Sequence, residues 1–124
     1  MKFSPEHVID VFFNHRFNFS DEIELQNAIS AVLTQSGIAF EREHRLSMRD
    51  KPDFILDTDC GKIAMEVKID GGKNPLLRQV NRYLSHDEIA GIIVVGTPYY
   101  IDLMPKTLNN KPIWSHRFLR SLLG

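Results

Sequence analysis

The sequence contains very little cysteine: Cys60 is the single one among 124 residues, so no internal disulfide can form. It also has no apolar run close to the roughly 20 residues that a membrane-spanning helix needs. The first residues, M-K-F-S-P-E-H, lack the long apolar stretch of a signal peptide. A single cysteine fits a reducing compartment. We therefore expect a cytoplasmic chain with no membrane partner.

The motifs of several enzyme classes are missing as well. There is no G-x-x-x-x-G-K-[ST] loop and no G-x-G-x-x-G turn, which argues against nucleotide-hydrolysing motors and dinucleotide enzymes. No histidine has the spacing from another histidine, a cysteine or an acid that zinc ligands show. The five scattered histidines are His7, His15, His44, His86 and His116. A zinc enzyme is therefore not expected.

The chain also lacks the excess of basic residues that is the usual mark of a nucleic-acid-binding domain. It has 15 Lys and Arg against 16 Asp and Glu, a formal net charge of −1. The charges are unevenly distributed, because residues 1–30 hold five acids and two bases, whereas residues 103–124 hold four bases and no acid. Any attraction to phosphate is expected to be local.

What the sequence does have is the composition of an ordinary globular chain, with 43% hydrophobic and 25% charged residues. Its length suits one domain over residues 1–124 with a single core. The patterns predict an α/β fold. Helices are expected over residues 5–13, 21–36, 74–84 and 117–123, and strands over residues 38–46, 52–57, 63–68, 89–96 and, at a sheet edge, 111–114. Residues 97–110 are expected to be mostly loop.

Capping residues mark the ends of the first two helices. Ser4 is a favoured N-cap residue, and Pro5 follows at the first helical position. The helix over residues 21–36 carries an apolar stripe at helical spacing, and Gly37 follows as a C-terminal signal. The stripe consists of Leu25, Ala28, Ile29, Val32 and Leu33.

The most informative segment is P-D-F-I-L-D, a polar turn over residues 58–62, and then I-A-M-E-V-K. Two short apolar runs around a turn that contains Gly61 predict a β-hairpin. Alternate side chains of a strand share a face. Glu66 and Lys68 therefore share one face with Ala64, and Asp53 at the start of the partner strand can reach them. The core-facing set is Ile63, Met65 and Val67.

Two carboxylates and an ammonium group on a small surface favour a divalent-metal site with a cationic helper. Asp and Glu oxygens suit Mg²⁺ or Mn²⁺, and Lys68 can orient the attacking water or offset charge on a phosphate. The chemistry predicted is hydrolysis of a phosphodiester. A surface hairpin with solvated charges is the alternative. Asp57 shares the parity of Asp53 and competes as an extra ligand, although its place at the turn favours solvation, as for Asp70.

A further carboxylate is expected from the helix over residues 21–36. Glu22 lies close to the apolar stripe of that helix, so it can lean over the sheet, whereas Glu24 points away. Glu24 also has another role available, because Asp21 as N-cap with Glu24 three residues later forms a capping box. Glu22 is therefore preferred as the helix carboxylate, with Glu24 the alternative.

The elements P-D, E-V-K and a following Q-x-x-x-Y, formed by Gln79 and Tyr83, resemble the PD-(D/E)XK nuclease superfamily. The Q-x-x-x-Y spacing is similar to that of its RecB-like and virus-type replication-repair branches. L-N-N-K-P-I-W resembles small phage-type members. The similarity covers about residues 20–96, between an N-terminal helix at 5–13 and a C-terminal extension at 97–124. It implies a restriction-endonuclease-like mixed central sheet with the core order α-β-β-β-α-β.

This resemblance implies a set of site residues. Asp53, Glu66, the Val67 carbonyl and Glu22 would bind Mg²⁺ or Mn²⁺, and Lys68 would complete the catalytic group. Gln79 and Tyr83 would order the site and contact the DNA backbone. The basic side chains on and before the same helix, Arg78, Arg82 and Lys73, would hold phosphates.

The function expected is a metal-dependent DNA nuclease of exonuclease, structure-specific nickase or junction resolvase type. Its setting would be the cytoplasm of a bacterial or phage-infected cell. A homodimer would supply a second active site to a chain this small. The alternative is a non-catalytic DNA-binding or assembly module that retains the nuclease fold.

Overall fold

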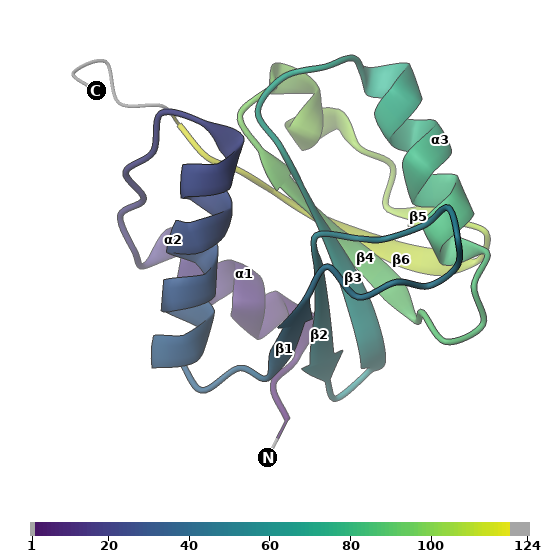
Figure 1. Cartoon of the computed structure of the whole chain (residues 1–124), viewed down its shortest axis with the longest axis horizontal. Helices are drawn as coiled ribbons and strands as arrows, with labels where there is room; N and C mark the ends of the chain where they lie inside the picture. The colour runs from purple at the N-terminus through teal and green to yellow at the C-terminus, as the bar shows by residue number, and fades with distance from the viewer. Residues whose placement is uncertain (1, 120–124) are drawn as a thin grey trace.

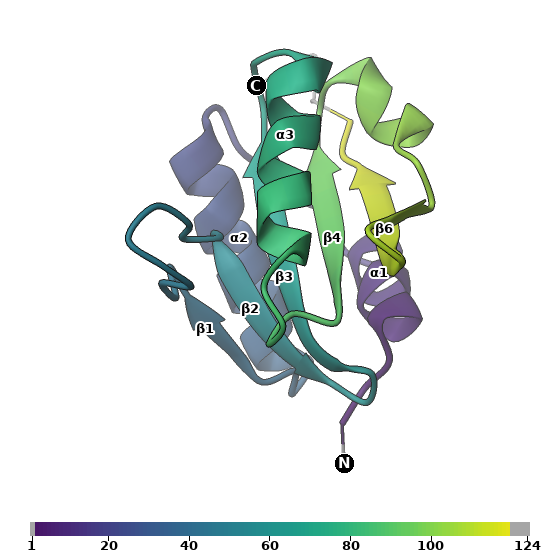
Figure 2. The same ribbon diagram turned by 90° about the vertical axis from the view of Figure 1, so that its right-hand side faces the viewer.

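A computed structural model describes residues 2–119 as a mixed α/β protein with a six-stranded mixed sheet and three α-helices. Helices α1 and α2 cover one face of the sheet, and α3 covers the other (Figures 1 and 2). The elements in order are α1 (Pro5–Phe13), α2 (Glu22–Gln35), β1 (Phe40–Arg42), β2 (Phe54–Thr58), β3 (Gly61–Lys68), α3 (Lys73–Leu84), β4 (Gly91–Gly96), the 3₁₀ helix η1 (Tyr99–Leu103), β5 (Thr107–Leu108) and β6 (Lys111–Arg117).

The sheet has the strand order β1-β2-β3-β4-β6-β5. Strands β1, β2 and β3 are antiparallel neighbours, whereas β3, β4 and β6 run parallel. The parallel strands therefore place their carboxyl ends at one edge of the sheet, where Lys68 of β3 lies opposite Gly96 of β4. This is the region in which open α/β sheets commonly bind ligands.

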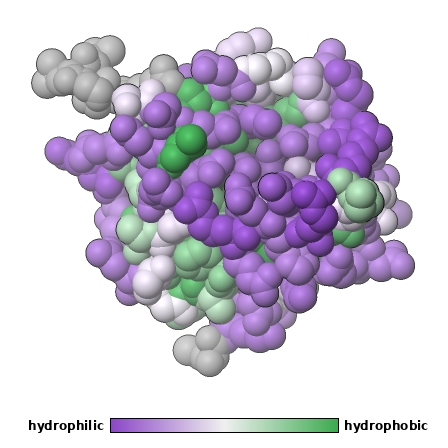
Figure 3. Space-filling view, in the orientation of Figure 1, coloured by the Kyte–Doolittle hydropathy of each residue, from purple (hydrophilic) through white to green (hydrophobic). Residues whose placement is uncertain are grey.

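Two apolar cores lie on the two faces of the sheet. The α1 and α2 side contains Leu25, Ile29 and Leu33, which pack with Met65 and Val67 of β3. The α3 side is built from Leu76, Val80 and Leu84 of that helix together with Ile55 and Ala64. The outer surface seen in Figure 3 is mostly hydrophilic, with apolar side chains in small separate patches.

The predicted caps of α1 and α2 are confirmed, with one difference. The Ser4 side chain accepts a hydrogen bond from the His7 N–H, and the Asp21 side chain accepts one from the Glu24 N–H at 2.8 Å. The Glu24 carboxylate, however, accepts from the N–H and hydroxyl of Ser20, one residue before the cap. The reciprocal half of the expected capping box is therefore displaced by one residue.

Three sequence-based boundaries were wrong. The strand expected over residues 38–46 is only β1, because Glu43 just after it takes a left-handed φ of 54°. The strand expected over residues 111–114 continues to Arg117 and is internal, since it pairs with both β4 and β5. Arg117 therefore belongs to a strand rather than to the expected last helix, and residues 120–123 of that helix lie outside the described part of the chain.

Among residues 2–119, none of the helices combines the length and the apolar character that crossing a membrane would need.

Gly96 allows β4 to approach β3 beside the candidate site. A Cβ atom added to Gly96 would overlap the Lys68 carbonyl oxygen, which is backbone and cannot rotate away. We expect Gly96→Ala to separate the ends of β3 and β4 and to lower the free energy of unfolding by about 3 kcal/mol. Urea denaturation measures this change. Gly72→Ala is the control, because its nearest neighbour would be Pro75 Cδ at 3.4 Å; an equal loss there would contradict the explanation.

Candidate active site

Asp53 and Glu66 lie side by side, as the hairpin pattern predicts. Residues Phe54 and Met65 are paired in the β2–β3 register, so Asp53 comes next to Glu66. The Val67 N–H donates to Asp53 Oδ2 at 2.8 Å, and the Asp53 N–H donates to Glu66 Oε1 at 3.2 Å. These two hydrogen bonds, each donated by a backbone N–H, fix the positions of both carboxyl groups. Both bonds depend on the pairing of β2 with β3.

Both carboxyl groups are held where their charge is unfavourable. Glu66 is only 3% exposed. Burial, together with repulsion between neighbouring carboxylates, raises the pKa of Asp53 to about 6 and that of Glu66 to about 8. The half-buried Asp53 and the buried Glu66 have little positive charge near them as compensation, so a cation bound beside them would stabilise the pair.

Lys68 supplies part of that compensation. Its Nζ lies 3.6 Å from Glu66 Oε2, and its side chain is 27% exposed. The same lysine borders two openings. One has a volume of about 400 Å³ and includes Glu22 and Asp70; the other has a volume of about 250 Å³ and includes Gln79 and Arg82. Lys68 thus lies between the acid pair and the accessible space of the two openings.

Glu22 belongs to α2, which covers the face of the sheet opposite to α3 (Figures 1 and 2). It opens α2, borders the larger opening with Lys68, and its charge raises the pKa of both Asp53 and Glu66. Glu24 instead bonds Ser20. Gln26, one turn beyond Glu22, accepts from Arg42 Nη2 at 3.0 Å and so supports β1 rather than Glu22. The surroundings therefore favour Glu22 over Glu24.

The choice between the two glutamates is testable. We expect Glu22→Ala to weaken divalent-metal binding, because it removes a carboxylate whose charge acts on both Asp53 and Glu66, while stability changes little. Glu24→Ala should instead cost about 1 kcal/mol of stability through its lost bonds to Ser20 and leave metal binding intact. Calorimetric titration with Mn²⁺ and urea denaturation separate the two effects. The reverse pattern would assign the site to Glu24.

Gln79 and Tyr83 form a pair on the inner face of α3. Gln79 Nε2 donates to the Tyr83 hydroxyl oxygen at 2.9 Å, and Tyr83 is 2% exposed. Burial and the nearby Glu66 carboxylate raise the pKa of Tyr83 above its ordinary value, so the hydroxyl stays protonated. Tyr83 therefore lies behind the acid pair, whereas Gln79 reaches the smaller opening.

The three basic residues of this helix region lie in different surroundings. Lys73 and Arg78 are exposed. Arg82 is half-buried, and its Nε donates to Asp50 Oδ1 at 3.0 Å, so it is not the free surface charge that the sequence suggested. Its terminal nitrogens make no hydrogen bond within residues 2–119 and remain beside the smaller opening.

Two acidic residues near the site, Asp50 and Glu43, were not predicted from the sequence. Asp50 is buried, accepts from Arg82 and lies 2.9 Å from His86 Nε2, and these partners hold its pKa below the ordinary value. It ties the loop before β2 to α3. Glu43 donates its N–H to the Asp53 carbonyl and adds negative charge near that residue. No local sequence signal marks either role.

The two competing acids lie apart from the pair. Asp57 forms an ion pair with Lys2 at 3.0 Å near the hairpin turn. Asp70 is exposed and borders both openings. Within residues 2–119, no three His, Cys, Asp or Glu side chains come together as a ready metal-binding group. The available donors are the two carboxylates of Asp53 and Glu66, with Glu22 near.

Comparison of the chain with protein-family models, curated proteins and solved structures gives no match.

Proposed function

We propose that this chain is a metal-dependent nuclease that hydrolyses phosphodiester bonds in DNA. The observation that carries the proposal is the arrangement of Asp53, Glu66 and Lys68. The half-buried Asp53 and the buried Glu66 are adjacent, each carboxyl group accepts a hydrogen bond from a backbone N–H, and the Lys68 ammonium group lies beside Glu66. Hard oxygen donors of this kind suit Mg²⁺ or Mn²⁺. No other cluster on the hairpin combines these features.

The order of elements supports membership of the PD-(D/E)XK superfamily. From α2 to β4 the chain runs helix, three strands, helix and strand, which is the order that the sequence resemblance implies for a restriction-endonuclease-like core. The P-D residues immediately precede β2, the E-V-K residues end β3, and Q-x-x-x-Y lies on α3. Element order alone does not establish function, so the site residues carry the proposal.

In the proposed mechanism, Asp53, Glu66 and Glu22 would hold the metal together with the Val67 carbonyl. The bound cation would lower the pKa of a water molecule and polarise the phosphate. Lys68 would orient the attacking water or stabilise charge on the phosphoryl oxygens. Gln79 and Tyr83 would keep the wall behind the acids rigid, while Lys73 and Arg78, with the terminal nitrogens of Arg82, would contact backbone phosphates.

A panel of single-stranded, double-stranded, flapped and four-way DNA, incubated with Mg²⁺, Mn²⁺ or chelator, tests the proposal. We expect cleavage of at least one substrate with either metal, none with chelator, and poor substitution by Zn²⁺ because the donors are oxygen atoms. Asp57→Asn is a matched control, since it removes an acid of the same hairpin that is paired with Lys2. Undiminished cleavage in excess chelator would contradict metal dependence.

The second candidate is a non-catalytic DNA-binding or assembly module. It is favoured by the lack of a three-residue metal group in the described part of the chain. Such a module would bind DNA in the same panel yet cut nothing with either metal. A homodimer and a bacterial or phage setting remain predictions from the sequence under both candidates.

A further inference from the structure

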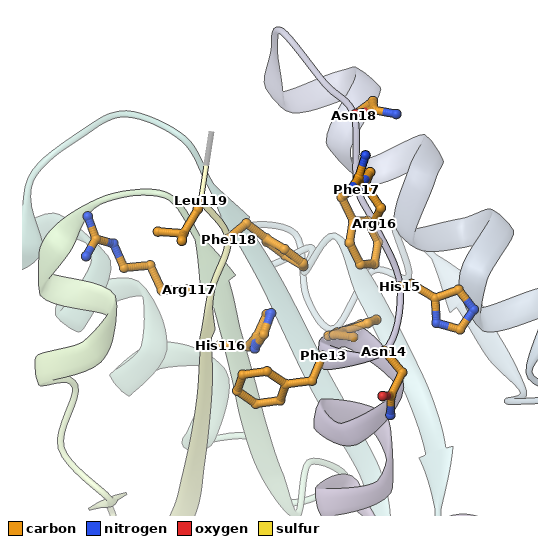
Figure 4. Close-up of a pocket in the computed structure, with 11 residues that line it drawn as sticks. Phe13, Asn14, His15, Arg16, Phe17, Asn18, His116, Arg117, Phe118 and Leu119 are labelled. Atoms are coloured by element: carbon orange, nitrogen blue, oxygen red, sulfur yellow. The ribbon is translucent and has the colours of Figure 1, made fainter. Parts of the chain in front are cut away.

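One of the hollows in the described part of the chain lies beyond β6, two strands away from Lys68 at the end of β3. It has a volume of about 820 Å³ and separates the end of β6 from residues 14–18, which follow α1 (Figure 4). Phe13, Phe17, His116 and Phe118 line it together with Arg16 and Arg117. We call this hollow the aromatic groove.

The aromatic rings of the groove are held by one another. Phe13 packs edge-on against His116 with centroids 4.5 Å apart, although its side chain is 72% exposed. The centroid of the Phe118 ring lies 4.7 Å from that of His116 and 4.6 Å from that of Phe17. Figure 4 shows these rings where β6 faces the end of α1 and residues 14–18. Burial lowers the pKa of His116, which keeps its ring neutral. A large exposed ring such as Phe13 on a fixed support is a surface on which another flat group can stack.

The charged side chains that line the aromatic groove are all basic. None of its lining residues is acidic, although the chain as a whole has a net charge of −1. Arg16 forms no ion pair with any residue of the described range 2–119. Arg117 is partly engaged, because its Nε donates to the Thr97 carbonyl and its Nη1 lies 3.7 Å from Asp102. The groove therefore complements an anion that carries flat apolar groups.

The aromatic groove is separated from the candidate active site by two strand spacings. The Phe118 N–H donates to the Gly96 carbonyl, and the Thr97 N–H donates to the Lys68 carbonyl, so the ends of β6, β4 and β3 lie in sequence. Two strand spacings amount to about 10 Å. The chain segment between α1 and α2 joins the two regions as well, since residues 14–18 line the groove and residues 20–22 border the opening beside Lys68.

We propose that the aromatic groove binds unpaired nucleotides of a single strand, with a base stacked on Phe13 and the phosphates near Arg16. Base–aromatic stacking beside a basic group is the way in which proteins hold single strands without reading their sequence. The strand would continue along residues 18–21 to Lys68. Nucleic acid as the ligand rests on the proposed function, which this groove would extend by directing the enzyme to single-stranded ends or flaps.

The test is fluorescence anisotropy with a labelled oligothymidylate of about 12 nucleotides, in chelator so that no cleavage occurs. We expect Phe13→Ala to weaken binding by at least about tenfold and Phe13→Trp to retain it, because stacking needs the ring face. Tyr99→Ala is the matched control: Tyr99 is 70% exposed, close to the 72% of Phe13, but lies outside the groove. Arg16→Gln should lower the log–log salt slope by about 0.7.

Equal binding by the wild type and Phe13→Ala would overturn the proposal. So would a change in self-association of Phe13→Ala, seen by light scattering, with unchanged oligothymidylate affinity, because the groove would then join two copies of the chain. Loss of binding in Phe13→Ala without cleavage by the wild type in any metal would support the groove and reject the nuclease. Metal-dependent cleavage with unchanged binding in Phe13→Ala would do the opposite.

Discussion

Replacing Lys68 with alanine is expected to lower the single-turnover cleavage rate by about 10²- to 10⁴-fold while DNA affinity in chelator stays nearly the same. Lys68 lies 3.6 Å from Glu66 and faces both openings, so it would act on the attacking water or on charge that develops at the phosphate. Interactions of that kind affect the transition state more than the bound ground state. Quenched-flow cleavage assays and anisotropy titrations measure the two quantities.

Two further variants make this experiment specific. Lys62→Ala removes a lysine from the same strand and the same face, but at the distant end beside Asp57, so it should leave the rate unchanged. Lys68→Arg keeps a positive charge but provides no group that can accept a proton near neutral pH. Recovery of the rate in Lys68→Arg would indicate charge stabilisation, whereas continued loss would indicate proton transfer or strict geometry. Full activity in Lys68→Ala would contradict the proposed role.

Replacing Glu66 with glutamine should have opposite effects on activity and stability. Cleavage should be lost, because glutamine is a poor ligand for the metal. The metal-free protein should become more stable at pH 8, by up to about 4 kcal/mol, because the pKa of Glu66 is raised from 4.5 to about 8, one pKa unit corresponds to roughly 1.4 kcal/mol, and the variant no longer buries that charge. The amide oxygen can still accept the hydrogen bond from the Asp53 N–H, so the backbone arrangement is retained.

The dependence on pH follows from the direction of the shift. The pKa of Glu66 is raised in the folded protein, to about 8. A raised carboxyl pKa means that the folded state holds its proton more tightly than the unfolded state. The free energy of unfolding of the wild type should therefore be largest near pH 4 and fall as the pH rises towards 8. Urea denaturation between pH 4 and 8 should show a flatter profile for Glu66→Gln than for the wild type. A Glu66→Gln protein less stable than the wild type at pH 8 would contradict this account.

The hairpin and its acids could be predicted because their geometry is local. A strand repeats every two residues, so the positions of Glu66, Lys68 and Val67 follow from the spacing once the turn is placed. The same holds for α2, where the helical period alone separates Glu22 from Glu24. Short-range rules also placed the caps at Ser4 and Asp21, which the structure confirms.

Features that depend on distant parts of the chain could not be predicted. Asp50 meets Arg82 and His86 only because the loop before β2 folds over α3, across separations of 32 and 36 residues. β6 extends to Arg117 because its residues pair with β4, and that pairing partner is distant in the sequence. The aromatic groove joins residues near both ends of the chain, so neither half has a recognisable motif.

The two outermost strands of the sheet are very short. β1 contains three residues and β5 contains two. Each offers few unpaired backbone groups, which limits the addition of a strand from another molecule and lowers the tendency to form extended fibrillar aggregates. Two copies of the chain would therefore associate through side chains of their helices or loops rather than through one continuous sheet. Crosslinks within a dimer are accordingly expected between helical or loop residues, and not between β1 and β5 of different copies.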